Sequence, residues 1–170
     1  MSETYRVRIQ KERLVFSAAH FITFAGDICE RLHGHNYHVY CEVEGPLDEN
    51  RYVVDFIALR DALQTIVDRL DHHMILPTSH PTIQVLERPA VDGGDEGEVV
   101  VTHGRRRWVF PRNDCILLPM QNTTAELLAR YIAAETKALI GPAGESLHSI
   151  EVGVDECDGQ WGVHRVTPAP

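Results

Sequence analysis

The chain has 170 residues, of which 44% are hydrophobic and 24% are charged. These proportions are typical of a soluble globular domain, and they exclude a disordered or collagen-like chain. No apolar run approaches the roughly 18 residues that a membrane helix needs, and the polar start of the chain lacks the apolar core of a signal peptide. We therefore expect one cytoplasmic domain over residues 1–170, with no membrane partner.

Acidic residues outnumber basic ones, with 25 Asp and Glu against 16 Lys and Arg, and the formal net charge is −9. A protein this acidic repels polyanions, so we expect no nucleic-acid partner. The four cysteines form no CxxC pair, which favours thiols over disulfides. Histidine is the outlier, and we expect function where four histidines cluster, at His20, His33, His35 and His38.

Apolar residues recur with a period of 2 in the predicted strands and with a period of 3.6 in the predicted helices. The first predicted strand alternates over 5–10 and continues, past a bend, through 14–16 to His20. The other predicted strands cover 35–44 and 150–156. The first predicted helix follows the N-cap Asp55 and has its apolar positions at Phe56, Leu59, Leu63, Ile66, Val67 and Leu70. The second begins at the capping box Thr123-Thr-Ala-Glu126 and ends at Gly141-Pro142.

The segment 77–118 between the two helices is predicted to be an insertion. It holds an acidic, Gly-rich loop at 92–97 and a hairpin with arms at 99–102 and 108–110. Residues 158–170 are predicted to form a flexible tail. The order of elements favours an α+β fold, with a mainly antiparallel sheet and the helices on one face.

His33-Gly34-His35 is the sharpest signal for a metal site. In an extended segment residues i and i+2 point to the same face, so both imidazoles can reach one ion. Glycine between them removes a side chain that would crowd the metal. His20, at the end of a neighbouring strand, would supply a third nitrogen, and three histidines suit a catalytic Zn²⁺ with an open fourth position. The alternative is a chance His-Gly-His tripeptide in a loop.

Cys29 is a candidate general base, because a nearby divalent cation stabilises a thiolate. The alternatives are a fourth zinc ligand or a plain buried thiol. Asp71 beside His72 at the end of the first helix is a candidate acid/base pair. The alternative is a histidine that interacts only with the helix dipole.

Glu156 ends the apolar face of the last predicted strand. Its carboxylate is suited to accept paired N–H bonds from a planar heterocycle, and the alternative is a solvated side chain. Arg105–Arg107 form either a solvated turn or the densest positive charge for a phosphate ligand.

These residues, taken in order, resemble the 6-pyruvoyl-tetrahydropterin synthase family, including its queuosine-pathway branch, 6-carboxy-tetrahydropterin synthase. The motifs that carry the resemblance are Phe16-Ser-Ala-Ala-His20, Cys29-Glu-Arg-Leu-His33-Gly-His35, Val54-Asp55-Phe56, Leu70-Asp71-His72, Thr123-Thr-Ala-Glu126 and Val154-Asp-Glu156. The three residues between Cys29 and His33 match the queuosine-pathway branch. Two departures are the absence of a Leu-Asn pair after His72 and the length of the 77–118 insertion, which we expect to reshape the pocket mouth or to neutralise phosphate.

The resemblance implies a tunnelling fold (T-fold), with a four-stranded antiparallel sheet, two helices on one face and the inserted hairpin. It also implies a homohexamer built as a dimer of trimers, with active sites at subunit interfaces. By matching positions it implies zinc ligands His20, His33 and His35, catalytic residues Cys29, Asp71 and His72, and pterin contacts from Glu156 and, more weakly, Thr124.

The implied reaction converts 7,8-dihydroneopterin triphosphate to 6-carboxy-tetrahydropterin, with release of triphosphate and acetaldehyde. One alternative is a homologue that acts on another 6-substituted pterin or makes 6-pyruvoyl-tetrahydropterin. Alternatives of other classes are a non-catalytic pterin-binding protein and a scaffold with structural zinc.

Overall fold

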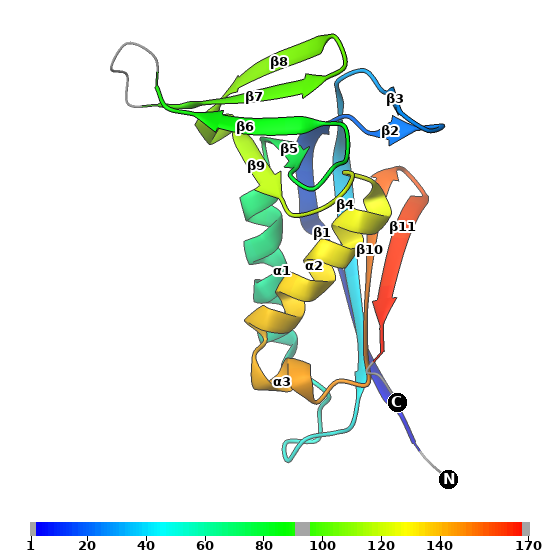
Figure 1. The fold of residues 1–170 in the computed structure, drawn as a ribbon. Helices are drawn as coiled ribbons and strands as arrows, with labels where there is room; N and C mark the ends of the chain where they lie inside the picture. Colours follow the sequence, from blue (N-terminus) through cyan, green and yellow to red (C-terminus); the bar gives the residue numbers. More distant parts are fainter. Residues whose placement is uncertain (1–2, 91–95, 168–170) are drawn as a thin grey trace. The chain divides into compact units, whose positions relative to one another are not determined.

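The computed structural model describes residues 3–90 and 96–167 (Figure 1). These residues divide into two compact units. The first unit holds 3–16, 36–71 and 125–167, and the second holds 17–35, 72–90 and 96–124. Two long strands contribute residues to both units, and each unit is described in turn.

Long antiparallel strands form the sheet of the first unit. They are β1 (Tyr5–His20), β4 (His33–Gly45), β10 (Ser149–Cys157) and β11 (Gln160–Val166), adjacent in the order β11-β10-β4-β1. Alternate residues of β4 are buried, including Tyr37, Val39 and Cys41. This period of 2 is the one that the sequence predicted for a half-buried strand.

Three helices belong to the first unit: α1 (Phe56–Leu70), α2 (Ala125–Leu139) and the short α3 (Pro142–Glu145). Asp55 caps α1 as predicted, since its carboxylate accepts the N–H groups of Ile57, at 2.7 Å, and Ala58, at 3.4 Å. Phe56, predicted as an apolar position of the buried face, is instead 63% exposed. Helix α2 packs beside α1 and against β10 and β11 (Figure 1).

The second unit is built on short strands. Strand β5 (His73–Pro77) pairs in parallel with the end of β1 and with β9 (Cys115–Leu118). Strands β6 (Gln84–Arg88), β7 (Glu98–His103) and β8 (Arg106–Pro111) form a separate antiparallel sheet. Strands β2 (Thr23–Phe24) and β3 (Ile28–Cys29) form a small hairpin, and residues Arg112–Asp114 form a 3-10 turn.

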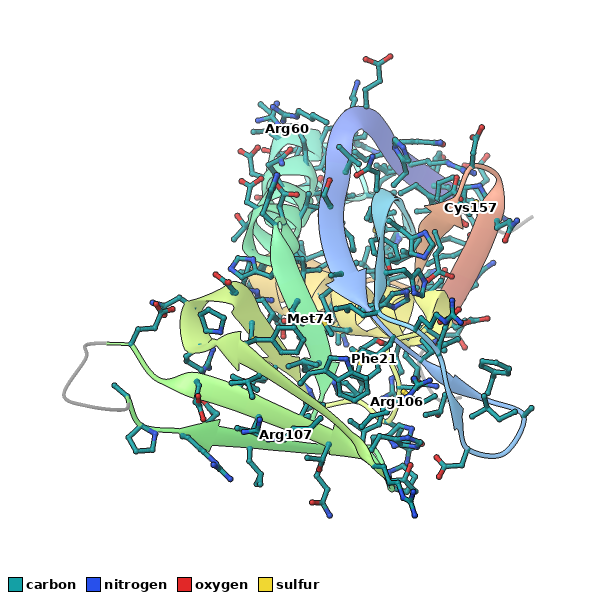
Figure 2. The ribbon with its side chains drawn as sticks, turned by 90° about the horizontal axis from the view of Figure 1, so that it is seen from above. Phe21, Arg60, Met74, Arg106, Arg107 and Cys157 are labelled. Atoms are coloured by element: carbon teal, nitrogen blue, oxygen red, sulfur yellow. The ribbon has the colours of Figure 1, made fainter. Side chains whose placement is uncertain are left out.

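An apolar core joins these short strands. Its buried members include Phe21, Cys29, Met74, Val99 and Val101. Figure 2 labels Phe21 and Met74 in this core, and the Phe21 ring stacks on Trp108 with centroids 4.6 Å apart. The loop that carries Cys29 and the strands of the 77–118 segment therefore share one hydrophobic interior.

The mixed α+β class is confirmed, whereas the four-stranded, wholly antiparallel sheet is not. Strands β5 and β9 add parallel pairs, and β6 makes a three-stranded sheet where a hairpin was expected. Residues 160–166 were assigned to a flexible tail but form β11, because the Asp155 carboxylate accepts the N–H groups of Gly159 and Gln160 and closes a tight turn. Residues 92–95 of the expected acidic loop and 168–170 of the expected tail lie outside the described residues.

Gly162 allows β11 to pack closely on the start of α2. A Cβ atom at this position would lie 2.6 Å from the backbone carbon of Ala125 and 2.6 Å from the backbone nitrogen of Glu126. We expect Gly162→Ala to lower the free energy of unfolding by about 1–3 kcal/mol, because backbone has to move. Urea denaturation measures this loss.

The control is Val163→Thr on the same strand, where the side chain is 45% exposed and the branched shape is kept. We expect it to change the free energy of unfolding by less than about 0.5 kcal/mol. Equal stability of the Gly162→Ala and unmodified proteins would contradict the close packing of β11 on α2.

Candidate active site

His20 lies at the end of β1, in phase with the buried row of that strand, and is 1% exposed. Its Nδ1 lies 2.9 Å from the Thr123 carbonyl oxygen. Because a carbonyl only accepts hydrogen bonds, Nδ1 carries the proton and Nε2 presents a lone pair. This tautomer suits a metal ligand, whose second nitrogen is normally held by a backbone carbonyl or a carboxylate.

His33 and His35 begin β4 on either side of Gly34. A Cβ atom at Gly34 would lie 3.0 Å from the Ala18 carbonyl oxygen, so glycine permits the close approach of β1. His33 Nδ1 donates to the Arg31 carbonyl at 2.8 Å, which leaves Nε2 as its lone-pair nitrogen.

The three histidines come together in the second unit. One ligand nitrogen from each lies within 4.8 Å of the others, and the ring centroids are 4.7 to 5.3 Å apart. Nitrogens that share one zinc ion are separated by about 4 Å at most. Small side-chain rotations would therefore bring this donor set onto one cation.

Cys29 ends β3, in the same unit as the histidine cluster, and is 7% exposed. Its thiol donates to the Glu30 carbonyl at 3.5 Å. Burial raises the pKa of the Cys29 thiol, and the Arg106 guanidinium acts in the opposite direction. The resting thiol is thus protonated near neutral pH, and positive charge nearby favours its ionisation.

Arg106 holds the loop that carries Cys29. Its Nη1 donates to the Cys29 carbonyl at 2.8 Å and to the Glu30 carbonyl at 2.7 Å. From the sequence, this arginine is predicted only as part of a solvated turn or as positive charge for a phosphate, because nothing local indicates a contact to residues so distant in the chain. Figure 2 labels Arg106 on the second unit.

Glu30 was not singled out from the sequence. Its Oε2 lies 3.8 Å from Nε2 of His33, so a carboxylate stands beside the candidate metal cluster. The available signal was an acidic residue three positions before His33, within the motif that carries the family resemblance.

Asp71 and His72 lie where the chain passes from the first unit to the second. Asp71 is the C-cap of α1, and its N–H donates to the Val67 carbonyl. His72 has a left-handed backbone, with φ of 58°, and its N–H donates to the Ser17 carbonyl at 2.7 Å. This conformation is uncommon for a residue with a side chain and often occurs at functional sites. The His72 side chain is exposed.

Glu156 lies in the first unit at an irregularity of β10, where the pairing with β11 shifts between Asp155 and Cys157. Such bulges redirect a side chain. The hydroxyl of the fully buried Tyr37 donates to Glu156 Oε1 at 3.4 Å. Thr124, the weaker candidate contact, is the last residue of the second unit, directly precedes α2 in the chain and is half-buried.

The model of the 6-pyruvoyl tetrahydropterin synthase family matches residues 8–166. The chain belongs to this family. The match confirms the resemblance seen in the sequence, and it supports a lyase that acts on a small-molecule pterin. Among the helices that the structure describes, none is long and apolar enough to cross a membrane.

Relatives by sequence include a Methanocaldococcus jannaschii protein that is provisionally named a 6-carboxy-5,6,7,8-tetrahydropterin synthase. It is 33% identical over 154 residues, which are 89% of this chain and 90% of that protein. The Aquifex aeolicus 6-carboxy-5,6,7,8-tetrahydropterin synthase is 26% identical over 151 residues, 85% of this chain and 82% of that protein.

Solved structures of the same family share the fold. The Plasmodium vivax 6-pyruvoyltetrahydropterin synthase matches with a TM-score of 0.84 and 27% identity, over 98% of this chain and 100% of that one. A second structure of the P. vivax enzyme, with the same scores, is described as a mutant in which alanine replaces a catalytic glutamate. These neighbours support the expected tunnelling fold.

The contacts of Arg106 generate a prediction for the Cys29 thiol. We expect Arg106→Gln to raise the Cys29 pKa further, because the hydrogen bond and the positive charge that oppose the effect of burial both come from the Arg106 guanidinium. Alkylation of Cys29 by iodoacetamide, followed by peptide mass spectrometry across a pH series, measures this change. The midpoint moves to higher pH.

The matched control is Arg105→Gln, which removes the same charge from the adjacent turn residue. We expect it to leave the alkylation midpoint unchanged. Identical midpoints in the Arg106→Gln and unmodified proteins would show that Arg106 does not act on the thiol.

Proposed function

We propose that the protein is a zinc-dependent lyase that converts 7,8-dihydroneopterin triphosphate to 6-carboxy-tetrahydropterin, with release of triphosphate and acetaldehyde. The observation that carries the proposal is the convergence of three histidine nitrogens within 4.8 Å, with Cys29 in the same unit. The names of the 6-carboxy-tetrahydropterin synthase relatives support the same product.

The donor set fits zinc. Three neutral imidazoles from His20, His33 and His35 leave a fourth coordination position open, as catalytic zinc requires. When bound, the ion would polarise side-chain oxygens of the pterin and make the adjacent C–H bonds more acidic.

The protein's own residues would move protons and hold the substrate. Cys29 takes a proton from the substrate side chain once its thiol has ionised, and Arg106 favours that ionisation. We assign the partner acid/base role to Asp71 and His72. Glu156 anchors the pterin ring by accepting paired N–H bonds, with its carboxylate oriented by Tyr37.

Thr124 is assigned a minor pterin contact. The proposed assembly is a homohexamer made of two trimers with active sites at subunit interfaces, in the cytoplasm. The 77–118 segment belongs to the same domain in this proposal and supports the loop that carries Cys29, through the carbonyl contacts of Arg106.

A second candidate activity is the formation of 6-pyruvoyl-tetrahydropterin. The solved P. vivax enzymes are 6-pyruvoyltetrahydropterin synthases, and one is described as lacking a catalytic glutamate. Glu30, whose carboxylate is 3.8 Å from His33 Nε2, is the candidate base for this alternative. A non-catalytic pterin-binding protein would need Glu156 but neither base.

The metal assignment predicts the effect of single histidine variants. We expect alanine at any one of the three cluster positions to weaken zinc binding by at least about 100-fold, since loss of an outer partner alone costs 10- to 100-fold. Competition with a chromogenic chelator measures the affinity. His148→Ala, an exposed histidine outside the cluster, is the control and should bind zinc normally.

Chelation tests a catalytic against a structural role of the metal. We expect removal of zinc to abolish turnover while the far-ultraviolet circular dichroism stays native-like, because each unit has its own apolar core. Unfolding of the domain on chelation would instead indicate structural zinc.

Product analysis with 7,8-dihydroneopterin triphosphate distinguishes the two candidate bases, Cys29 and Glu30. We expect Cys29→Ala to lower formation of 6-carboxy-tetrahydropterin by about 10² to 10⁴-fold, while zinc and ligand still bind. Mass spectrometry identifies the products. If the 6-pyruvoyl product dominates and depends on Glu30, then Glu30→Gln abolishes it and the alternative activity is the correct one.

The controls are Cys157→Ala and Glu49→Gln, which change an exposed cysteine and an exposed glutamate. Both should turn over at the unmodified rate. Full turnover in Cys29→Ala would remove the thiol from the mechanism.

A further inference from the structure

A hollow of about 330 Å³ opens beside the loop that carries Cys29. It is lined by Arg31, Leu32, Arg106, Arg107 and Trp108. Three of these five residues are arginines, and none of the described residues that line the hollow is acidic. Positive charge is therefore concentrated at one place in a chain whose net charge is −9.

Backbone contacts connect this hollow to the candidate metal cluster. The Arg31 carbonyl accepts the Nδ1–H of His33 at 2.8 Å, and the two residues are at most about 7 Å apart along the chain. Arg106 donates to the carbonyls of Cys29 and Glu30. Arg31 and Arg106 are thus held next to the segment that carries Cys29 and His33.

Trp108, which lines the hollow, packs on a buried ring. Trp108 stacks on Phe21, which directly follows His20, with an interplanar angle of 20°. Strand β8 lies at the edge of its sheet. A two-residue turn joins it to β7, and the residues on either side of this turn, His103 and Arg106, pair with each other. In such a ladder the next residue, Arg107, directs its N–H away from β7, so it offers a backbone donor at the open edge. Figure 2 labels Arg106 and Arg107 on this strand.

We propose that this hollow binds the phosphate chain of the substrate. This inference rests on the proposed function, in which the triphosphate is the leaving group at the end of the pterin side chain. A guanidinium matches two phosphate oxygens at once, and such charge-assisted pairs are among the strongest hydrogen bonds in proteins. When the oxygens of the pterin side chain lie at the histidine cluster, the phosphates extend past Arg31 into the hollow. There the arginines supply the positive charge that the rest of this acidic protein lacks.

Inorganic tripolyphosphate is the probe for this subsite, and isothermal titration calorimetry on the zinc-loaded protein measures its affinity. We expect Arg31→Gln and Arg107→Gln each to weaken binding by about tenfold, as for the loss of one charged hydrogen bond. Arg105→Gln, the adjacent arginine that does not line the hollow, should stay within about twofold. Binding should also weaken as salt is added.

Steady-state kinetics separates this inference from the proposed function. We expect KM for 7,8-dihydroneopterin triphosphate to rise about tenfold in the Arg31→Gln and Arg107→Gln proteins and not in Arg105→Gln. Tripolyphosphate binding that depends on these arginines, in a protein without lyase activity, would support the subsite and overturn the function. Normal turnover with unchanged KM and unchanged tripolyphosphate affinity in both variants would overturn the subsite and leave the function standing.

Discussion

The close approach of β1 and β4 at Gly34 is the constraint on which the candidate site depends. A Cβ atom there would lie 3.0 Å from the Ala18 carbonyl oxygen, which is tighter than usual, so a larger residue would push the two strands slightly apart. His20 follows Ala18 by two residues, and His33 and His35 flank the glycine. This backbone contact lies between the strand ends that carry the three histidines, so strand packing is a second reason for the glycine, beside space at a metal.

A second set of contacts places Cys29. The loop before it is tied to the 77–118 segment at Asp27, whose carboxylate accepts from the Thr82 hydroxyl at 2.6 Å and contacts His103 Nε2 at 2.9 Å. These hydrogen bonds, the Thr82 contact first, hold the pKa of Asp27 below its usual range. Together with Arg106 they make the segment a support for the loop, a role that its sequence did not reveal.

Periodicity predicted the long elements and the position of His20, because 16 residues of β1 and 15 of α1 give a repeated signal. Periodicity did not predict β5 and β9, because their short apolar runs show no alternation. It did not predict β11 either, because Gly162 and exposed polar residues hide the alternation of apolar side chains there. The histidine cluster was within reach of local reasoning because its members sit near strand ends. The contact of Arg106 with the Cys29 carbonyl could not be predicted from local sequence, since it joins residues 77 apart in the chain.

Glu156 is held by a residue that belongs to the interior of the first unit. Tyr37 donates to its carboxylate, is fully buried, and stacks on Phe16 with ring centroids 4.8 Å apart. Interior packing and orientation of the carboxylate thus share the same aromatic pair. In the proposed function, a substitution at Phe16 would therefore act in two ways: it would leave volume unfilled beside Tyr37, and it would move the ring whose hydroxyl orients the Glu156 carboxylate.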